Sequence, residues 1–129
     1  MATKTQMKIL IVDDSAPNRS LMAKILDGLG YTNHVDSPDG MDALKKLNSD
    51  PFTLVLLDWN MPQMSGIDLL RTIKRSQTLR HVAVIMVTAN GELENVKAAI
   101  SLGVTDYIVK PVAANALKEK IDRLMLKFS

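Results

Sequence analysis

Short continuous apolar runs, separated by segments with helical periodicity, restrict the fold of this chain more than any other feature. The clearest runs are residues 9–12, 54–57, 82–87 and 107–109. Runs of this length without alternating polar residues are typical of strands buried on both faces of a parallel sheet. Because they alternate with helix-like segments from end to end, the pattern predicts successive strand–helix units and an α/β fold.

Helical periodicity fills the intervals between these runs. The first helix is predicted over residues 17–29, with Leu21, Ile25 and Leu29 on its inner face, and a weaker strand at residues 34–36. Five strand–helix units account for residues 1–129, which we expect to form one domain. The third helix is expected to turn Ile67, Leu70 and Ile73 inward. Apolar residues at helical spacing in the other helices are Met41, Leu44 and Leu47, then Leu93, Val96 and Ile100, and finally Leu117, Ile121, Leu124 and Phe128.

Composition excludes several classes of function. Hydrophobic residues make up 47% of the chain and charged residues 23%, as in ordinary globular domains, and the net charge of +2 is too small to favour nucleic-acid binding. The absence of cysteine excludes disulfides and thiolate metal sites, and together with the lack of a signal-peptide pattern it favours the cytoplasm. The longest apolar run has six residues, so we expect no membrane span.

Chemically active residues stand where the predicted strands end. Asp13 and Asp14 follow the first run, Asp58 follows the next, and Thr88 and Lys110 follow the last two. In an open parallel sheet, ligands bind outside the carboxyl ends of the strands, at the switch point in strand order. Three carboxylates, a hydroxyl and an ammonium group are therefore expected in one crevice, which indicates a phosphoryl-transfer site.

The acidic pair has an alternative structural interpretation. Asp13 or Asp14 could cap the first helix, since aspartate accepts hydrogen bonds from free amides at a helix start. However, a helix needs only one such acceptor, and Ser15 could also serve. Two adjacent carboxylates at a buried strand end repel each other unless a cation is present. Mg²⁺ fits this arrangement, because it takes few carboxylates, keeps several waters and uses substrate phosphate as a further ligand.

Each of the other three side chains also has an ordinary interpretation when taken alone. Asp58 could belong to a turn, Thr88 could be a simple strand residue and Lys110 a surface lysine. Together, however, they supply a carboxylate nucleophile and two groups that bind phosphate oxygens. The backbone carbonyl of Asn60, in the loop after the third strand, could complete a metal shell.

The motifs in their order along the chain resemble those of the receiver domain of two-component response regulators, and most closely the single-domain chemotaxis regulators of that family. The resemblance covers nearly the whole chain and implies a doubly wound, flavodoxin-like sheet of five parallel strands in the order 2-1-3-4-5 with five helices. The matching residues are Asp13-Asp14, Asp58-Trp59-Asn60-Met61-Pro62, Gly66, Thr88-Ala89, Tyr107 and Lys110-Pro111.

The resemblance implies a role for each matching position. Asp58 would be the phosphoacceptor for a histidine kinase, while Thr88 and Lys110 would hold the phosphoryl oxygens. Tyr107 would be an aromatic switch that turns inward on activation. The implied Mg²⁺ ligands are Asp13, Asp14, Asp58 and the Asn60 carbonyl.

The implied output is binding of a downstream protein, with the flagellar motor switch as a candidate and a phosphatase as a possible further partner. Val112 stands where motor-binding members usually have phenylalanine, Ser15 where a bulkier residue is common, and Asn90 where glutamate is frequent. These departures leave the flagellar partner and the dephosphorylation rate open. The expected partner face lies on the fourth helix, fifth strand and last helix, with contacts from Leu93, Val96, Tyr107, Val109, Lys120 and Arg123.

Other functions fit the sequence less well. A phosphatase with an aspartyl nucleophile needs a second aspartate two residues later as general acid, and that position holds Asn60. Nucleotide binding needs a glycine-rich loop after the first strand, where Asp13-Asp14-Ser15 stands instead. A DNA-binding regulator would need an effector domain beyond the last predicted helix.

Overall fold

A computed structural model describes residues 4–59, 61, 64–88 and 93–127, without the side chains of residues 93–95 and 127. Five parallel strands form one sheet in the order β2-β1-β3-β4-β5, which confirms the predicted order and fold class. The elements are β1 (Ile9–Val12), α1 (Ala16–Gly28), β2 (His34–Ser37), α2 (Gly40–Ser49), β3 (Leu54–Asp58), α3 (Gly66–Arg75), β4 (Ala83–Thr88), α4 (Leu93–Ser101), β5 (Asp106–Val109) and α5 (Ala114–Lys127).

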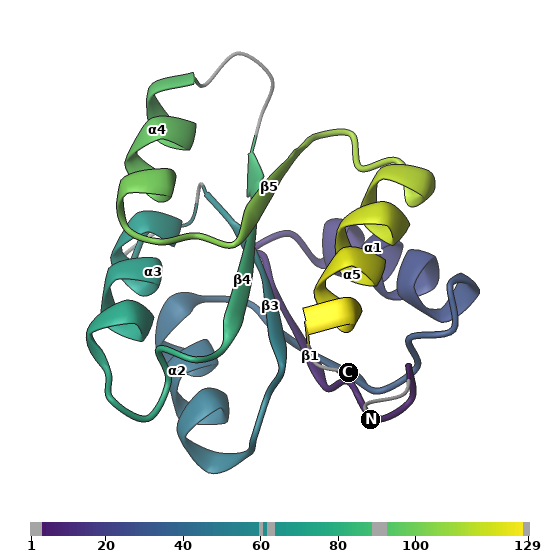
Figure 1. Cartoon of the computed structure of the whole chain (residues 1–129), viewed down its shortest axis with the longest axis horizontal. Coiled ribbons are helices and arrows are strands. Elements are labelled where there is room, and N and C mark those ends of the chain that lie inside the picture. The colour runs from purple at the N-terminus through teal and green to yellow at the C-terminus, as the bar shows by residue number, and fades with distance from the viewer. Residues whose placement is uncertain (1–3, 60, 62–63, 89–92, 128–129) are drawn as a thin grey trace.

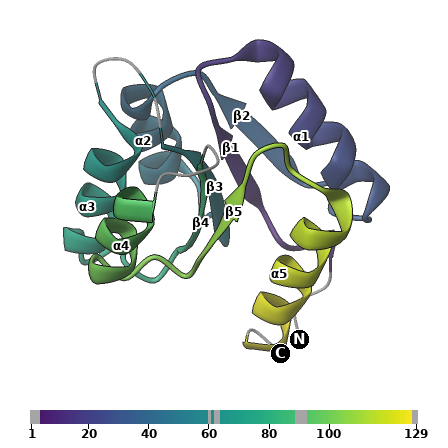
Figure 2. The same ribbon diagram turned by 90° about the horizontal axis from the view of Figure 1, so that it is seen from above.

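The helices cover both faces of the sheet. Helices α1 and α5 lie on one face, and α2, α3 and α4 lie on the other (Figure 1; Figure 2). Alternate strand residues therefore enter different cores: Ile9 and Ile11 pack with the α1 and α5 side, whereas Leu10 and Val12 pack with the opposite side. This explains why the central strands are apolar at every position instead of alternating with polar residues.

In three helices, some apolar residues at the predicted helical spacing are exposed. Helix α1 buries Met22 and Leu26, whereas Leu21 is 52% exposed. Ile25 and Leu29 pack against the same core as partly buried residues, and Leu21 and Ile25 line a cavity beside the sheet. Met41 and Ile100, which fit the helical spacing, are also exposed, and in their helices Ala43 and Ala99 are fully buried.

Helix α5 follows its predicted pattern and is bonded to the loop between α1 and β2. Leu117, Ile121 and Leu124 are buried, while Phe128 lies outside the described residues. Tyr31, in the loop after α1, is fully buried and its hydroxyl donates a 2.6 Å hydrogen bond to the Asp122 carboxylate. Across the described part of the chain, no helix has the length and apolarity needed to cross a membrane.

Candidate functional site

Strand register brings the three predicted carboxylates together at the carboxyl edge of the sheet. Val12 pairs with Leu57 on the neighbouring strand, so Asp13 and Asp58 leave adjacent strands side by side. Carboxylate oxygens of Asp13, Asp14 and Asp58 lie within 4.8 Å of one another. Asp58 is only 4% exposed and Asp13 is also buried, whereas Asp14 is exposed. The cluster is therefore open to solvent on the Asp14 side.

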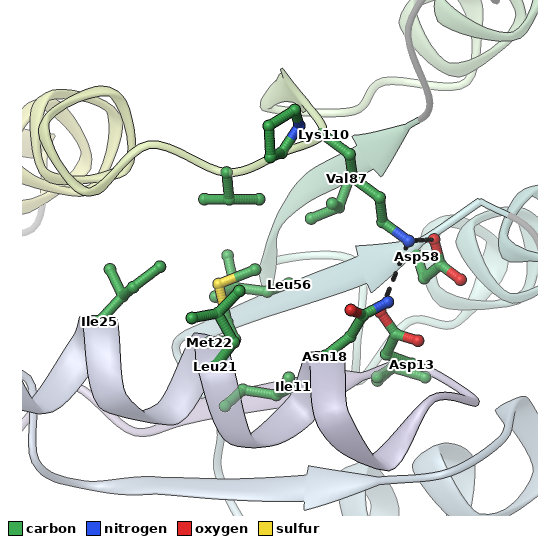
Figure 3. A pocket seen from close by; sticks show the side chains of 13 residues that line it. Ile11, Asp13, Asn18, Leu21, Met22, Ile25, Leu56, Asp58, Val87 and Lys110 are labelled. Atoms are coloured by element: carbon green, nitrogen blue, oxygen red, sulfur yellow. Dashed lines mark ion pairs between the residues drawn. The ribbon is translucent and has the colours of Figure 1, made fainter.

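Lys110 reaches this cluster from the end of β5. Its Nζ lies 2.9 Å from Asp58 Oδ1 and 3.7 Å from Asp13 Oδ2, so the ammonium group is shared by two carboxylates (Figure 3). Its backbone N–H donates to the carbonyl oxygen of Thr88, and the Lys110–Pro111 peptide bond is cis. Thr88 is a buried residue at the end of β4. All four strand ends predicted to carry chemistry thus meet at one edge.

Burial and charge act in opposite directions on these groups. Burial raises the pKa of the Asp58 carboxyl, and the charges of Asp13 and Asp14 add to this, although the hydrogen bond from Lys110 opposes it. For Lys110, burial alone would lower the pKa, but the hydrogen bond and charge of Asp58, with the charges of Asp13 and Asp14, raise it overall. Lys110 is therefore a cation in the resting site and compensates part of the carboxylate charge.

The acidic pair does not serve as the cap of α1. Ser15 is the N-cap residue, and its hydroxyl oxygen accepts the backbone N–H of Asn18 at 3.3 Å. The Asp13 carboxylate instead accepts the backbone N–H of Ser15 at 2.9 Å through Oδ1. The capping interpretation of these aspartates is thus replaced by one in which Ser15 caps the helix and the carboxylates remain at the strand ends.

Gly66 allows the start of α3 to lie close against the end of β3. Its N–H donates a 2.9 Å hydrogen bond to the carbonyl oxygen of Trp59. A Cβ atom at this position would overlap the carbonyl oxygen of Asp58 and lie 2.9 Å from the Cα of Trp59. The start of α3 therefore contacts the backbone of Asp58–Trp59 directly, so any side chain at Gly66 would displace it.

An apolar cavity of about 340 Å³ opens beside the carboxylates. It lies between α1 and the segment after β5, and Leu21, Ile25 and Val112 line it together with Asp58 and Lys110 (Figure 3). Low-dielectric surroundings strengthen electrostatic interactions between the charged groups at its end. The site thus combines a concentrated charge cluster, open to solvent on the Asp14 side, with an apolar wall on the side of α1.

The predicted partner face lies along β5 and α5. Tyr107 is 38% exposed, with Lys120 Nζ 5.5 Å from its ring centroid. The carboxylate of Asp106 lies 2.9 Å from Lys120 Nζ and 3.9 Å from Arg123 Nη1. In this structure the Tyr107 ring therefore faces outward under a lysine that is itself paired with Asp106.

Of the residues proposed for this face, Val96 is partly exposed and Val109 is 38% exposed. Asn60 and the side chain of Leu93 lie outside the described residues. Sequence reasoning missed Arg19, whose Nη1 donates a 2.7 Å hydrogen bond to the carbonyl oxygen of Asp13. The only signal for it was its position in the first turn of the helix that follows the acidic pair, which does not distinguish it from a surface arginine.

The donor set fits Mg²⁺. Hard oxygen ligands from a few carboxylates, with one side open to water, are what this ion takes in proteins. Asp13, Asp14 and Asp58 provide such a set, and the repulsion among them is compensated only in part by Lys110. A divalent cation would satisfy the remaining charge.

Comparisons with known proteins agree with this geometry. The family model "Response regulator receiver domain" matches residues 9–122. The chain is 45% identical over 118 residues to the chemotaxis protein CheY of Pseudomonas aeruginosa, covering 92% of this chain and 95% of that protein. It is equally similar to CheY-3 of Vibrio cholerae, with 92% and 91% covered.

Solved structures show the same fold. The chemotaxis protein CheY4 of Vibrio cholerae superposes with a TM-score of 0.83 at 27% identity, covering 91% of this chain and 97% of that one. A CheY-like receiver domain protein from Methanospirillum hungatei superposes with a TM-score of 0.84 at 31% identity, covering 94% of both chains.

Proposed function

Because the chain belongs to the response regulator receiver domain family and is similar to single-domain CheY proteins, we propose that it is a phosphorylation-activated switch with Asp58 as phosphoacceptor. The position of the Asp58 carboxylate carries this proposal. It is buried, 2.9 Å from Lys110 Nζ and within 4.8 Å of two further carboxylates. Residues 1–129 act as one receiver domain, and a histidine kinase is the donor.

Phosphoryl transfer forms a bond between an Asp58 oxygen and phosphorus while the bond from phosphorus to the imidazole nitrogen of the donor breaks. The Lys110 ammonium, already beside Asp58, donates to a phosphoryl oxygen after transfer, and the Thr88 hydroxyl from the next strand is the second donor. Asp13, Asp14 and Asp58, with the Asn60 carbonyl, would hold Mg²⁺, which when bound neutralises charge on the transferring group.

The test uses a small-molecule donor and intact-protein mass spectrometry. With acetyl phosphate and Mg²⁺, the wild type should gain one phosphate, and Asp58→Asn should gain none. Asp50→Asn is the matched control, since Asp50 is an exposed carboxylate at the end of α2 and should not affect labelling. Undiminished labelling of Asp58→Asn would move the acceptor elsewhere and refute the assignment.

Lys110 is expected to act on the phosphoryl group more than on the ion, because its ammonium cannot be a metal ligand. Lys110→Ala should therefore retain Mg²⁺ binding while losing the response of the partner face to phosphorylation. Trp59, the single tryptophan of the chain and adjacent to Asp58, reports binding at the site by its fluorescence. Loss of the Mg²⁺ response together with the phosphorylation response would contradict this division of roles.

The output surface is formed by α4, β5 and α5. Phosphoryl oxygens at Asp58 draw in the Thr88 hydroxyl, and the Tyr107 ring turns into the space that this vacates. The Tyr107 ring faces outward in this structure, which supports this proposal, because a ring that turns inward on phosphorylation must start from an outward position. Phosphorylation shifts the equilibrium only by its differential interaction with the two states, so the inward state is sampled beforehand.

The proposed partner is a protein helix with an apolar face and acidic flanks, which suits Val96, Tyr107 and Val109 with Lys120 and Arg123 at the rim. Acidic partner groups compete with Asp106 for these two cations. Leu93, whose side chain lies outside the described residues, belongs to the same proposed face.

A pull-down with and without beryllofluoride, a phosphoryl mimic, tests the placement of this face. Recovery of the partner should rise with beryllofluoride for the wild type and for Lys45→Glu, a control on α2, which lies on the face of the sheet opposite to α5. For Lys120→Glu, recovery of the partner with beryllofluoride should be lower than for the wild type. Equal recovery with and without the mimic in every variant would refute the proposed surface.

We assign the switch to chemotaxis on the names of its CheY relatives, and propose the cytoplasm as its location because the sequence contains no cysteine. A phosphatase is the proposed further partner, and the flagellar motor switch is the leading single candidate for the target. Expression in a motile strain that lacks its own CheY tests this directly: the wild type should restore spreading in soft agar and Asp58→Asn should not. Failure of the wild type with normal phosphorylation would place the protein in another two-component pathway.

A further inference from the structure

Arg19, in the first half of α1, supports the acidic cluster from outside. Its Nη1 donates a 2.7 Å hydrogen bond to the backbone carbonyl oxygen of Asp13, and its Nε donates a 2.8 Å bond to Asp36 Oδ2 on β2. The side chain is 17% exposed, so most of it is enclosed between these two acceptors. A guanidinium group presents its donors in a rigid planar fork, which suits two acceptors in fixed directions.

Asp13 is fixed at three points by these and neighbouring bonds. Its N–H donates to the carbonyl oxygen of Ser37 at 3.1 Å, its carbonyl accepts from Arg19, and its Oδ1 accepts the Ser15 N–H at 2.9 Å. Two of the three anchors depend on the end of β2, directly through Ser37 and indirectly through Asp36. The remaining oxygen, Oδ2, faces Lys110.

We propose that Arg19 is a positioning residue that sets the affinity of the site for Mg²⁺ by holding the backbone of Asp13. The inference rests on the proposed function, since it concerns the same cluster. Groups that hold a metal ligand in its direction typically change metal affinity by about 10–100-fold when they are replaced. Arg19 holds its ligand through the main chain, so the lower end of that range, a loss of about tenfold, is expected.

A purely electrostatic effect of Arg19 predicts the opposite change in Mg²⁺ affinity. A guanidinium group near carboxylates repels a divalent cation, so a purely electrostatic role means that Arg19→Gln tightens Mg²⁺ binding. A positioning role means that the same substitution weakens it, because glutamine cannot span both acceptors. A role in folding alone lowers the melting temperature and leaves the affinity unchanged. The direction of the change in affinity thus separates the three roles.

Isothermal titration of the unphosphorylated protein with MgCl₂, after treatment with chelator, measures this affinity without any phosphotransfer. Three variants are compared with the wild type: Arg19→Gln, Arg19→Lys and Asp36→Asn. Lysine keeps the charge with a single donor group and should recover part of the affinity. Asparagine at position 36 still accepts from Arg19 Nε and should change the affinity less than twofold. Thermal melting in chelator verifies that each variant is folded.

Tenfold weaker binding by Arg19→Gln, with partial recovery in Arg19→Lys and near-normal binding by Asp36→Asn, is the expected result. Unchanged or tighter binding by Arg19→Gln overturns the inference, and so does an equal loss in Asp36→Asn, which would assign the effect to the ion pair. If Arg19→Gln does not fold, a normal affinity in Arg19→Lys overturns it as well. Absence of Mg²⁺ binding by the wild type contradicts the metal site of the proposed function itself.

Discussion

Replacing Asp58 by asparagine should stabilise the metal-free protein, even though it removes one partner of an ion pair. The Asp58 carboxylate is buried and shares its surroundings with two other carboxylates and one ammonium group. Asparagine has nearly the same shape, and its amide oxygen can still accept the hydrogen bond from Lys110. The substitution therefore removes a buried charge without leaving a cavity or an unpaired donor.

The structure gives the magnitude. With an effective dielectric constant of about 20, repulsion from each carboxylate at the 4.8 Å limit is about 3.5 kcal/mol, or about 7 kcal/mol for two. Attraction to Lys110 at 2.9 Å is about 6 kcal/mol on the same basis, and partial exposure of Lys110 reduces it. Burial of the charge adds a cost with the same sign as the repulsion. We expect Asp58→Asn to raise the free energy of unfolding by about 1–3 kcal/mol, with the melting temperature rising about 4 °C per kcal/mol.

Urea denaturation in chelator at pH 7.5 measures this difference (~0.5 kcal/mol is resolvable). Asp50→Asn is the control and should stay within about 0.5 kcal/mol of the wild type, because Asp50 is exposed. Saturating Mg²⁺ should reverse the order, since the ion stabilises only a protein that binds it. A variant less stable than the wild type in chelator would refute the reasoning that repulsion and burial outweigh the ion pair.

Three further outcomes follow from particular contacts. The gain in unfolding free energy of Asp58→Asn over the wild type should vanish in acid. The pKa of Asp58 in the folded protein is raised above its ordinary value of 3.8, so the stability of the wild type falls as pH rises from 3.8 through the folded pKa. The full difference between the two proteins is therefore expected only at pH values above the folded pKa. Gly66→Ala should lower the free energy of unfolding in urea by about 1–3 kcal/mol, because its Cβ atom would overlap the backbone of Asp58. Gly28→Ala should instead raise it by about 0.5–1 kcal/mol, because a Cβ atom in this helix position meets no atom within 4 Å. Tyr31→Phe should cost about 1 kcal/mol by the same measurement, because it removes the hydrogen bond from the buried hydroxyl to Asp122, which keeps its bond from Lys118.

The fold class was predictable because the apolar runs of strands and the apolar spacing of helices can be recognised within short stretches of the sequence. Sheet order could not be derived from the runs themselves and came from the family resemblance. Strand ends were predicted within a residue, and Gly30, with a φ of 93°, ends α1 as glycine readily does. Because parallel strands place their carboxyl ends at one edge, the convergence of Asp13, Asp58 and Lys110 followed from the fold alone.

Periodicity was less reliable for residues at the margins of packed faces. Leu21 fits the inner spacing of α1 but borders a cavity, and Tyr31 is fully buried in a loop, where no period applies. His34 lies on β2 with its Nε2 2.7 Å from Oδ1 of Asp27 on α1. Contacts such as this and the bond from Arg19 to Asp13 depend on how α1 sits on β2, which no local pattern encodes.

The parallel sheet has a further consequence for unfinished or damaged copies of the protein. Asp13, Asp58 and Lys110 come from three strands that pair through crossovers distant in sequence, so no hairpin can assemble even part of the cluster locally. A chain that has paired β1 with β3 but not β4 with β5 brings the carboxylates together without their ammonium partner. Such a copy cannot present a complete site to a donor. A molecule misfolded in this way would therefore fail to signal, and it would not signal incorrectly.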